Sequence, residues 1–312
     1  MMSPSNHILL QDFFLSPWLL GLLGLCIGSF LNVVVHRLPL MLERQWWQDA
    51  AAQLTDADSW QRLTREPAPD WLATTSAQLD RHLHPLTDMS LAHPPSRCPH
   101  CGHTIRWFEN IPLVSWLFLR GRCSACHAPI SIRYPLLELG TGVLFAAVSW
   151  RFGSAPVSLL WCGMVAVLVA LTAIDWDTTL LPDALTLPLL WAGLIAAWMR
   201  WTVPLSDAVV GAAAGYLILW SVYWAFKLAT GKEGMGYGDF KLLAALGAWL
   251  GWQALVPILL ISSTIGAVAG VALKFSGGLR QGRYVPFGPF LAGAALVVIL
   301  VGVAPVLRWI SP

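Results

Sequence analysis

The sequence predicts an all-α polytopic membrane protein, and its composition, hydropathy and tryptophan content point to that class. Hydrophobic residues make up 56% of the 312 residues and charged residues only 12%, whereas a soluble domain carries about 25% charged residues. The mean hydropathy is +0.62. The 18 tryptophans fit, because Trp anchors helices at the bilayer interface. These values exclude an ordinary soluble enzyme, and a net charge of +2 argues against a nucleic-acid partner.

Eight apolar segments are candidates for membrane-spanning helices. A helix rises about 1.5 Å per residue, so roughly 20 apolar residues cross a hydrocarbon core of about 30 Å. The sixth segment is too short to span alone, and Gly251-Trp252-Gln253 offers a turn after it, so we expect a helical hairpin with a short first arm. The eight segments are Phe13–Val35, Tyr134–Trp150, Pro156–Ile174, Ala184–Met199, Leu205–Ala229, Phe240–Leu250, Ala254–Phe275 and Val285–Leu307.

The distribution of Lys and Arg predicts the orientation of these helices. With the N-terminus outside, sixteen of the 19 basic residues, Arg280 and Arg283 among them, fall on the cytoplasmic side. The other three, Arg151, Arg200 and Arg308, fall outside. Because cytoplasmic loops carry the excess of Lys and Arg, both termini are predicted to lie on the outer side of the lipid bilayer.

A polar block divides the chain into three predicted regions. Residues 1–36 form an N-terminal membrane helix, residues 37–133 a cytoplasmic loop domain, and residues 134–312 a membrane core of about seven helices. Within the loop domain, the stretch from Glu43 to Asp88 holds eight acids against four arginines. We interpret residues 41–95 as a partly helical, acidic insertion at the surface, either a solvated appendage or a docking surface.

Two cysteine pairs in the loop domain predict a structural zinc site. Cys98 and Cys101, followed by Cys123 and Cys126, give a C-x2-C-x21-C-x2-C pattern. Each C-x2-C turn presents two sulfur atoms to one ion, and four thiolates close a tetrahedral Zn²⁺ site with no position for water. The alternatives are two disulfides or four free thiols, but disulfides rarely persist in the cytoplasm.

Two aspartates at the cytoplasmic edge of the membrane core are candidates for catalysis. Asp175 closes the third predicted span and Asp239 opens the sixth, so the topology places both at one depth. Two neighbouring carboxylates can share a proton, one acting as acid and one as base toward water, as in aspartic proteases. Gly236 and Gly238 precede Asp239, and we expect them to allow a sharp turn and the approach of an extended peptide.

Other acids near the spans have simpler explanations. Asp183 follows Pro182 before an apolar run, where we expect it to cap a helix. Asp177 is expected to be solvated, whereas Glu138 lies inside the second span and needs a polar partner. A transporter that uses paired acids remains an alternative, although it explains neither the cysteines nor the glycines before Asp239.

Taken together and in order, these motifs resemble the type IV prepilin peptidase family, the GxGD-type intramembrane aspartyl proteases. The resemblance covers nearly the whole chain except the acidic insertion. Besides the two cysteine pairs, it rests on Gly28–Pro39, Phe108–Trp116, Leu119–Cys123, Ile174-Asp175 with Leu181–Asp183, and Gly236–Asp239.

The resemblance implies a function, a location and further site residues. Members of this family cleave the basic leader from type IV prepilins or type II secretion pseudopilins at the cytoplasmic face of the bacterial inner membrane. Asp175 and Asp239 would be the catalytic pair, and the four cysteines the zinc ligands. Many members also methylate the new N-terminus with S-adenosylmethionine, so Glu109, Asn110 and Gly121 become candidates for methyl transfer, and a peptidase without that activity is the alternative. The termini would then be periplasmic.

Overall fold

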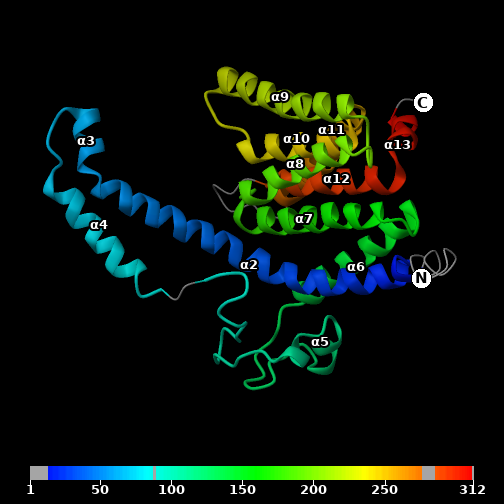
Figure 1. Cartoon of the computed structure of the whole chain (residues 1–312), viewed down its shortest axis with the longest axis horizontal. Coiled ribbons are helices and arrows are strands. Elements are labelled where there is room, and N and C mark those ends of the chain that lie inside the picture. Colours follow the sequence, from blue (N-terminus) through cyan, green and yellow to red (C-terminus); the bar gives the residue numbers. More distant parts are fainter. Residues whose placement is uncertain (1–12, 87–88, 276–284, 311–312) are drawn as a thin grey trace, which may run out of the picture.

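The computed structural model describes residues 13–86, 89–275 and 285–310. Most of this described part is helical, and its β pairing consists of two isolated bridges in the cysteine-rich loop. The predicted all-α class is confirmed. Figure 1 shows a bundle of helices from which a long helical arm projects at one end.

The first described helix, α2 (Pro17–Thr55), is much longer than the predicted first span. Ser16 caps its start, and Pro17 occupies the first turn, where a missing N–H costs nothing. Its 39 residues extend roughly 58 Å, about twice the thickness of a hydrocarbon core. The helix continues past Val35 and Pro39 into the acidic insertion, so the predicted span covers only its first part. The predicted boundary between residues 36 and 37 falls inside one continuous helix.

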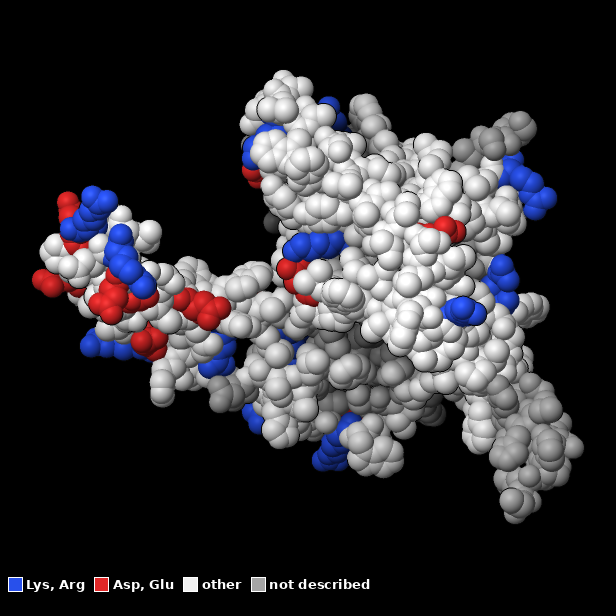
Figure 2. Space-filling view, turned by 45° about the horizontal axis from the view of Figure 1, so that its top comes forward, with Lys and Arg blue, Asp and Glu red and all other residues white. Residues whose placement is uncertain are grey.

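The acidic insertion is a helical arm. After α2 the chain forms α3 (Ala57–Thr64) and then α4 (Asp70–Leu83), which packs back along α2. The hydroxyl group of Ser76 donates to the carbonyl oxygen of Ala51 at 3.0 Å, and the arm carries most of the acidic side chains visible in Figure 2.

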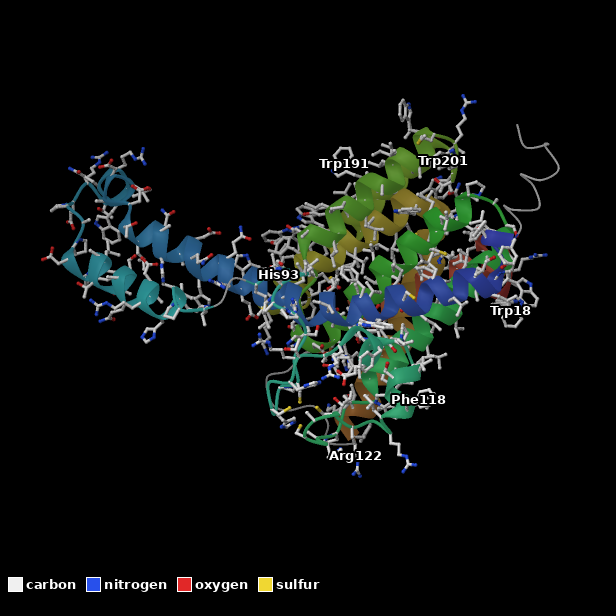
Figure 3. All side chains as sticks on the ribbon, turned by 60° about the horizontal axis from the view of Figure 1, so that its bottom comes forward. Trp18, His93, Phe118, Arg122, Trp191 and Trp201 are labelled. Atoms are coloured by element: carbon white, nitrogen blue, oxygen red, sulfur yellow. The ribbon has the colours of Figure 1, made fainter. Side chains whose placement is uncertain are left out.

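The segment that follows the arm is attached to α2 through Arg37. This buried guanidinium group donates to the carbonyl oxygens of Ser90 at 2.9 Å and Pro94 at 2.6 Å. The chain then forms the cysteine-rich loop, which contains the short helices η1 (Trp107–Asn110) and α5 (Val114–Phe118). In Figure 3, Phe118 and Arg122 lie on the part of this loop far from the bundle.

Helix α6 (Arg133–Phe152) returns along the first half of α2 at close range. A side chain at Gly28 would place its Cβ atom 2.7 Å from the Cα atom of Glu138, so this contact requires glycine. Near the other end of the pair, the hydroxyl group of Ser149 donates to the carbonyl oxygen of Leu15 at 2.6 Å. Close backbone contact through small residues is typical of helix pairs in membranes.

The next four helices pack together into a core with α10 at its centre. They are α7 (Val157–Thr178), α8 (Asp183–Trp198), α9 (Leu205–Thr230) and α10 (Tyr237–Leu250). Helix α10 contacts α8, α9 and α12, and eleven of its 14 residues are buried. Its indole at Trp249 donates to the carbonyl oxygen of Leu189 at 2.8 Å. This short helix is stable at the centre of the core because neighbouring helices cover it on several sides.

The chain after α10 follows the predicted hairpin and then departs from the prediction. A turn at η2 (Trp252–Ala254) leads into α11 (Leu255–Phe275), as expected. The predicted eighth span instead consists of α12 (Gly288–Val301) and α13 (Val303–Ile310), which meet at a bend of 109°. Gly302 provides the bend with a φ of 97°, a value that disfavours other residues.

Four described helices are long and apolar enough to cross a membrane, and the bent pair α12–α13 would make five. The four lie within Pro17–Thr55, Val157–Thr178, Leu205–Thr230 and Trp252–Phe275. The chain is thus a multi-pass membrane protein, whereas the number of eight spans stays a prediction.

The outer surface and the ends of the bundle fit a membrane setting. Trp18 and Trp201, 85% and 52% exposed, are both labelled in Figure 3 and lie on the outside of the bundle. The start of α2 and helix α13 lie at one end of the bundle in Figure 1. The loops after α7 and α9 lie at the opposite end. Arg280 and Arg283, used to predict the orientation, lie outside the described residues.

Candidate active site and metal site

The structure places Asp175 and Asp239 in the wall of one cavity. Asp175 lies in the last turn of α7 and Asp239 in the first turn of α10, and they are 4% and 7% exposed. The two carboxylates are close enough to interact electrostatically. The cavity has a volume of about 770 Å³. Two acids that are 64 positions apart in the sequence therefore line the same cavity.

Four further parts of the chain complete this cavity. The end of α7, the loop after it and the start of α8 supply residues 177–184, and the loop before α10 supplies residues 233–236. Val285, Pro286 and Phe287 line it just before α12. Leu42 and Trp46 reach it from the part of α2 that extends beyond the predicted first span.

The surroundings of Asp175 leave one carboxylate oxygen available. Its Oδ2 atom is buried and has no hydrogen-bond partner among the described residues. A Cβ atom on Gly288, the first residue of α12, would lie 2.5 Å from that oxygen. Glycine at position 288 thus keeps the space beside the carboxylate open.

The two glycines before Asp239 have different roles. Gly236 immediately precedes α10 with φ −86° and ψ 155°, an ordinary extended conformation, so the expected sharp turn is not found there. A Cβ atom on Gly238 would lie 2.7 Å from the Cβ atom of Leu181. Gly238 is needed for the close packing of α10 on the α7–α8 loop, which brings Asp239 toward Asp175.

Three acids at the rim of the cavity each pair with a basic residue. Asp177 pairs with Arg133 at 2.6 Å, so it is not simply solvated. Asp183 pairs with Lys241 at 2.7 Å. The prediction that Asp183 caps α8 is wrong, because Pro182 occupies the cap position and no side-chain cap bond forms there.

The third rim pair fixes the loop that leads to Asp239. Lys227, near the end of α9, contacts a carboxylate oxygen of Glu233 at 2.8 Å and the hydroxyl group of Tyr223 at 3.1 Å. The ammonium group of Lys227 lowers the pKa of Glu233 below its usual range. The ring of Tyr237 packs on that of Tyr223, so the loop is held on α9 by both charge and aromatic contact.

The four cysteines form a separate cluster that fits a metal ion. Their sulfur atoms all lie within 4.8 Å of one another. The Sγ–Sγ distances are 3.7 Å for Cys98 and Cys126 and 4.0 Å for Cys101 and Cys123. Tetrahedral coordination with bonds of about 2.3 Å requires sulfur atoms about 3.8 Å apart. The four thiols can therefore hold one metal ion with little movement.

Two turns of the same design present these thiols. In the first, the N–H of Cys98 donates to the carbonyl oxygen of His103, and in the second that of Cys123 donates to Ala128, both at 2.9 Å. The N–H of Cys101 lowers the pKa of Cys98 to about 7, and the N–H of Cys126 lowers that of Cys123. The backbone thus favours thiolates, the form that binds metal.

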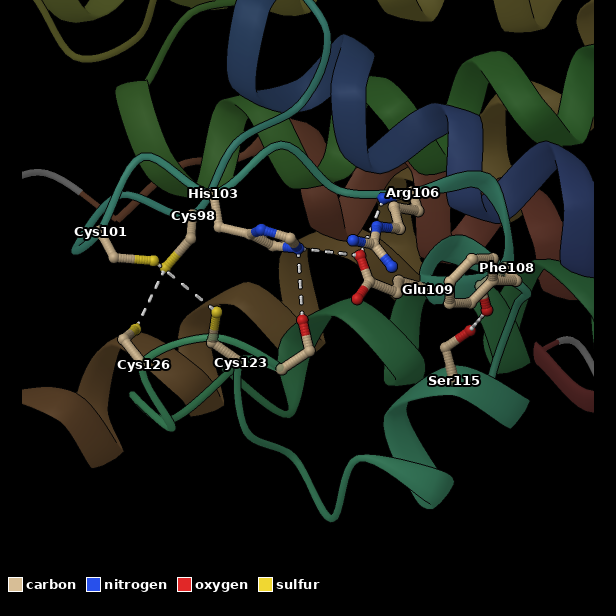
Figure 4. Close-up of polar contacts among 10 residues, drawn as sticks. Cys98, Cys101, His103, Arg106, Phe108, Glu109, Ser115, Cys123 and Cys126 are labelled. Carbon is tan, nitrogen blue, oxygen red and sulfur yellow. Dashed lines mark hydrogen bonds and ion pairs between the residues drawn. The ribbon is translucent and has the colours of Figure 1, made fainter.

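The candidates for methyl transfer lie in the cysteine-rich loop and do not line the cavity of Asp175 and Asp239, the candidate catalytic cavity. A carboxylate oxygen of Glu109 accepts from the N–H of Arg106 at 2.9 Å and lies 3.2 Å from Nε2 of His103, as Figure 4 shows. The Arg106 N–H is the main cause that lowers the pKa of Glu109 to about 2. Gly121 has a φ of 66°, and a Cβ atom there would lie 2.9 Å from Trp116. Asn110 is exposed.

Glu138 joins the membrane helices to the cysteine-rich loop. Its carboxylate accepts from the N–H of Leu113 at 2.8 Å, which supplies the expected polar partner. Leu113 has a φ of 59°, an uncommon value for a residue with a branched side chain. A buried acid of α6 therefore holds a strained turn of the loop against the bundle.

Sequence reasoning missed several residues of the cavity. Leu42 and Trp46 belong to the stretch interpreted as a surface insertion, either a solvated appendage or a docking surface. Nothing in the local sequence indicates that α2 passes Asp175 and Asp239. Gly288 lies between Phe287 and Pro289, and a glycine beside a proline at a helix start was a usable signal.

A helical membrane protein in which two buried aspartates face one cavity has the architecture of an intramembrane aspartic peptidase. The chain belongs to the type IV leader peptidase family, whose family model matches residues 162–271. Residues 22–152 match the bacterial peptidase A24 N-terminal domain.

Relatives support this assignment over almost the whole chain. A protein of Aeromonas hydrophila is 51% identical over 94% of both chains. One from Pseudomonas putida is 50% identical over 90% of this chain and 88% of its own, and one from Pseudomonas aeruginosa is 49% identical over 90% and 89%. All three are named prepilin leader peptidase/N-methyltransferase. No solved structure gives a significant match. Membership of this family removes the transporter alternative.

Proposed function

We propose that this protein removes the leader peptide from prepilin-type substrates and then methylates the new N-terminal amine. The pair of buried aspartates in one cavity carries the proposal. The names of the relatives support both reactions. The proposed substrates are type IV prepilins or type II secretion pseudopilins.

In the proposed cleavage, Asp175 and Asp239 share one proton. The ionised carboxylate takes a proton from water, whose oxygen forms a bond to the carbonyl carbon of the scissile peptide. The protonated carboxylate donates a hydrogen bond to the carbonyl oxygen. The C–N bond then breaks as its nitrogen takes a proton from the pair. The products are an amine on the substrate and a carboxylate on the leader. The unpartnered Oδ2 atom of Asp175 supports a role in carrying this proton.

Substitution of each aspartate tests this assignment. Asp175→Asn and Asp239→Asn should each abolish cleavage of a prepilin, because neither amide can act as the base. Asp207→Asn is a matched control, since Asp207 is the third residue of α9 as Asp239 is of α10, and it contacts Gln253 far from the cavity. Substantial cleavage by Asp175→Asn would remove that residue from the catalytic pair.

The four cysteines are proposed to bind a structural Zn²⁺ ion. Their sulfur spacing supports tetrahedral thiolate coordination, which leaves no open position for water. None of them lines the catalytic cavity among the described residues. The ion would therefore stabilise the loop and take no part in peptide cleavage.

Methyl transfer is proposed to use the cysteine-rich loop, with S-adenosylmethionine as the donor. The amine nitrogen forms a bond to the methyl carbon, the sulfonium C–S bond breaks, and the amine loses a proton. The contacts of Glu109 and Gly121 indicate that these two residues serve to fold the loop. Asn110 is exposed and is therefore the better candidate for methyl transfer. Mass analysis of processed substrate, with and without the donor, separates this proposal from a peptidase alone. Asn110→Ala should reduce methylation while cleavage continues.

The proposed location is the bacterial inner membrane, with eight spans and both termini periplasmic. The catalytic cavity and the cysteine-rich loop would then face the cytoplasm, where the basic residues gather. The three predicted regions, 1–36, 37–133 and 134–312, remain the proposed domains, with α2 shared between the first two. Accessibility of single cysteines introduced at the α8–α9 and α9–α10 turns tests the orientation, since only the former should react from the periplasm.

A further inference from the structure

A second, apolar groove opens beside the catalytic cavity. It has a volume of about 460 Å³ and lies between α9, α11 and the start of α12. Ile218 and Val222 of α9 form one wall, and Ala267 lies on the facing wall of α11. Both residues of α9 are more than a third exposed, so the groove is open along the side of the bundle.

The groove is continuous with the catalytic cavity. Met235, Val285 and Phe287 line both spaces. Met235 belongs to the loop that leads to Asp239, and Phe287 immediately precedes Gly288, which faces Asp175. A chain lying in the groove would therefore reach the two aspartates without leaving the protein surface.

The lining of the groove suits an apolar helix. On α11 the lining residues recur at Leu259, Ser263, Gly266 and Ala267, a spacing that places them on one helical face. They extend about 12 Å along the axis, which matches about two turns of a bound helix. Among the described residues that line the groove, Ser263 has the only polar side chain. The small side chains on this face permit the close approach of another helix.

The two ends of the combined space differ in charge. The rim of the catalytic cavity carries charged side chains, whereas no charged residue lines the groove in the described part of the chain. The rim acids Asp177, Asp183 and Glu233 pair with bases, and one of these bases, Lys241, also lines the cavity. A substrate with a basic leader on one side of the scissile bond and an apolar segment on the other matches this division. This contrast favours the charged leader at the rim and the apolar segment in the groove.

We propose that this groove binds the apolar segment of the prepilin that follows the scissile bond, as a helix that enters sideways from the bilayer. The inference rests on the proposed function and assigns a binding site to one half of that substrate. The leader would lie across the charged rim, and the scissile bond would lie at the shared residues Met235 and Phe287.

A bulky residue in the groove tests the assignment. Ala267→Trp should lower kcat/KM for a full-length prepilin at least tenfold more than for a short peptide that contains the leader and only a few residues after the cleavage site. Ala272→Trp is the matched control, because Ala272 is an exposed small residue of α11 that does not line the groove. Its ratio of the two kcat/KM values should equal that of the unmodified protein. If Ala267→Trp gave the same ratio as the unmodified protein, the assignment would be overturned.

Photo-crosslinking gives an answer that does not depend on the activity of the bulky variant. A benzoylphenylalanine at position 267 in the Asp239→Asn protein should crosslink to the apolar segment of an uncut prepilin, and one at position 272 should not. Crosslinks to lipid alone, or equal crosslinks from both positions, would contradict the proposal. Failure of the unmodified protein to process either substrate would instead overturn the proposed function itself.

Discussion

The four-cysteine cluster and the catalytic cavity are assembled over very different distances in the sequence. All four thiols come from residues 98–126, presented by two backbone turns of the same design. The cavity draws its walls from Leu42 to Phe287, and its two aspartates come from opposite ends of two helices. The cluster is thus a local structure, whereas the cavity exists only when the membrane helices have packed.

This contrast predicts how each site responds to substitution. A ligand lost from the cluster removes its metal but leaves the packing of α7, α10 and α12 in place. A small steric change among those helices disturbs the cavity but leaves all four thiols within reach of one ion. The two sites should therefore fail independently.

The largest effect is expected from Cys123→Ser, which removes a buried thiol proposed to bind the metal. Structural zinc sites contribute on the order of 10 kcal/mol to the folding of small domains, so the cysteine-rich loop should lose its metal and become sensitive to protease. Metal analysis of the purified protein should fall from about one ion per chain to nearly none. Ser124→Ala provides a neighbouring control that should retain the metal, and full metal content in Cys123→Ser would contradict the ligand assignment.

Adding a single methyl group beside Asp175 should impair the cavity while leaving the cysteine cluster intact. In Gly288→Ala the new Cβ atom would lie 2.5 Å from Oδ2 of Asp175, so the carboxylate must move. We expect cleavage to fall about 100-fold, equivalent to about 2.7 kcal/mol, with unchanged metal content. Gly293→Ala in the same helix has open space and should retain activity. Equal activity in the two variants, measured as kcat/KM, would show that the contact is unimportant.

The connection between the two regions is expected to depend on Glu138. Glu138→Ala removes the acceptor for the Leu113 N–H and should destabilise the docked loop by about 1.5–3 kcal/mol, the usual value for a hydrogen bond to a charged group. Glu138→Gln keeps an acceptor and should lose less. Hydrogen exchange of the amide of Leu113 measures this directly, and full protection in Glu138→Ala would exclude the role.

The smallest effect is expected at the wall contributed by α2. Trp46 lines the cavity and the adjacent Trp47 does not, although both are about half exposed. Trp46→Ala should raise KM for prepilin cleavage severalfold with little change in kcat, because it removes contact area for the substrate and leaves both aspartates unchanged. Trp47→Ala should leave both constants unchanged. Equal KM values in the two variants would place the substrate away from α2.

The same contrast explains how much the sequence predicts. Spacing in the sequence is enough to predict the cluster, because the adjacent backbone sets the positions of Cys98, Cys101, Cys123 and Cys126. Asp175 and Asp239 can be found because acids are scarce at membrane depth and the topology places both at one end.

Other features depend on tertiary contacts that no local pattern records. The ion pair of Asp183 with Lys241, the place of Gly288 beside Asp175 and the passage of α2 along the cavity all join residues far apart in the chain. The bend at Gly302 is another case. The hydropathy pattern could not predict it, because the residues on both sides of the bend are apolar.

The central claim is that Asp175 and Asp239 act as one catalytic unit. The most direct test compares kcat/KM for prepilin cleavage in Asp175→Asn, Asp239→Asn and the double variant, each with its metal content confirmed. Residues that act as a unit are strongly non-additive, so all three variants should fall to one common floor. A single variant that retains more than about a tenth of the activity, with the double variant lower by the product of the two losses, would contradict the claim.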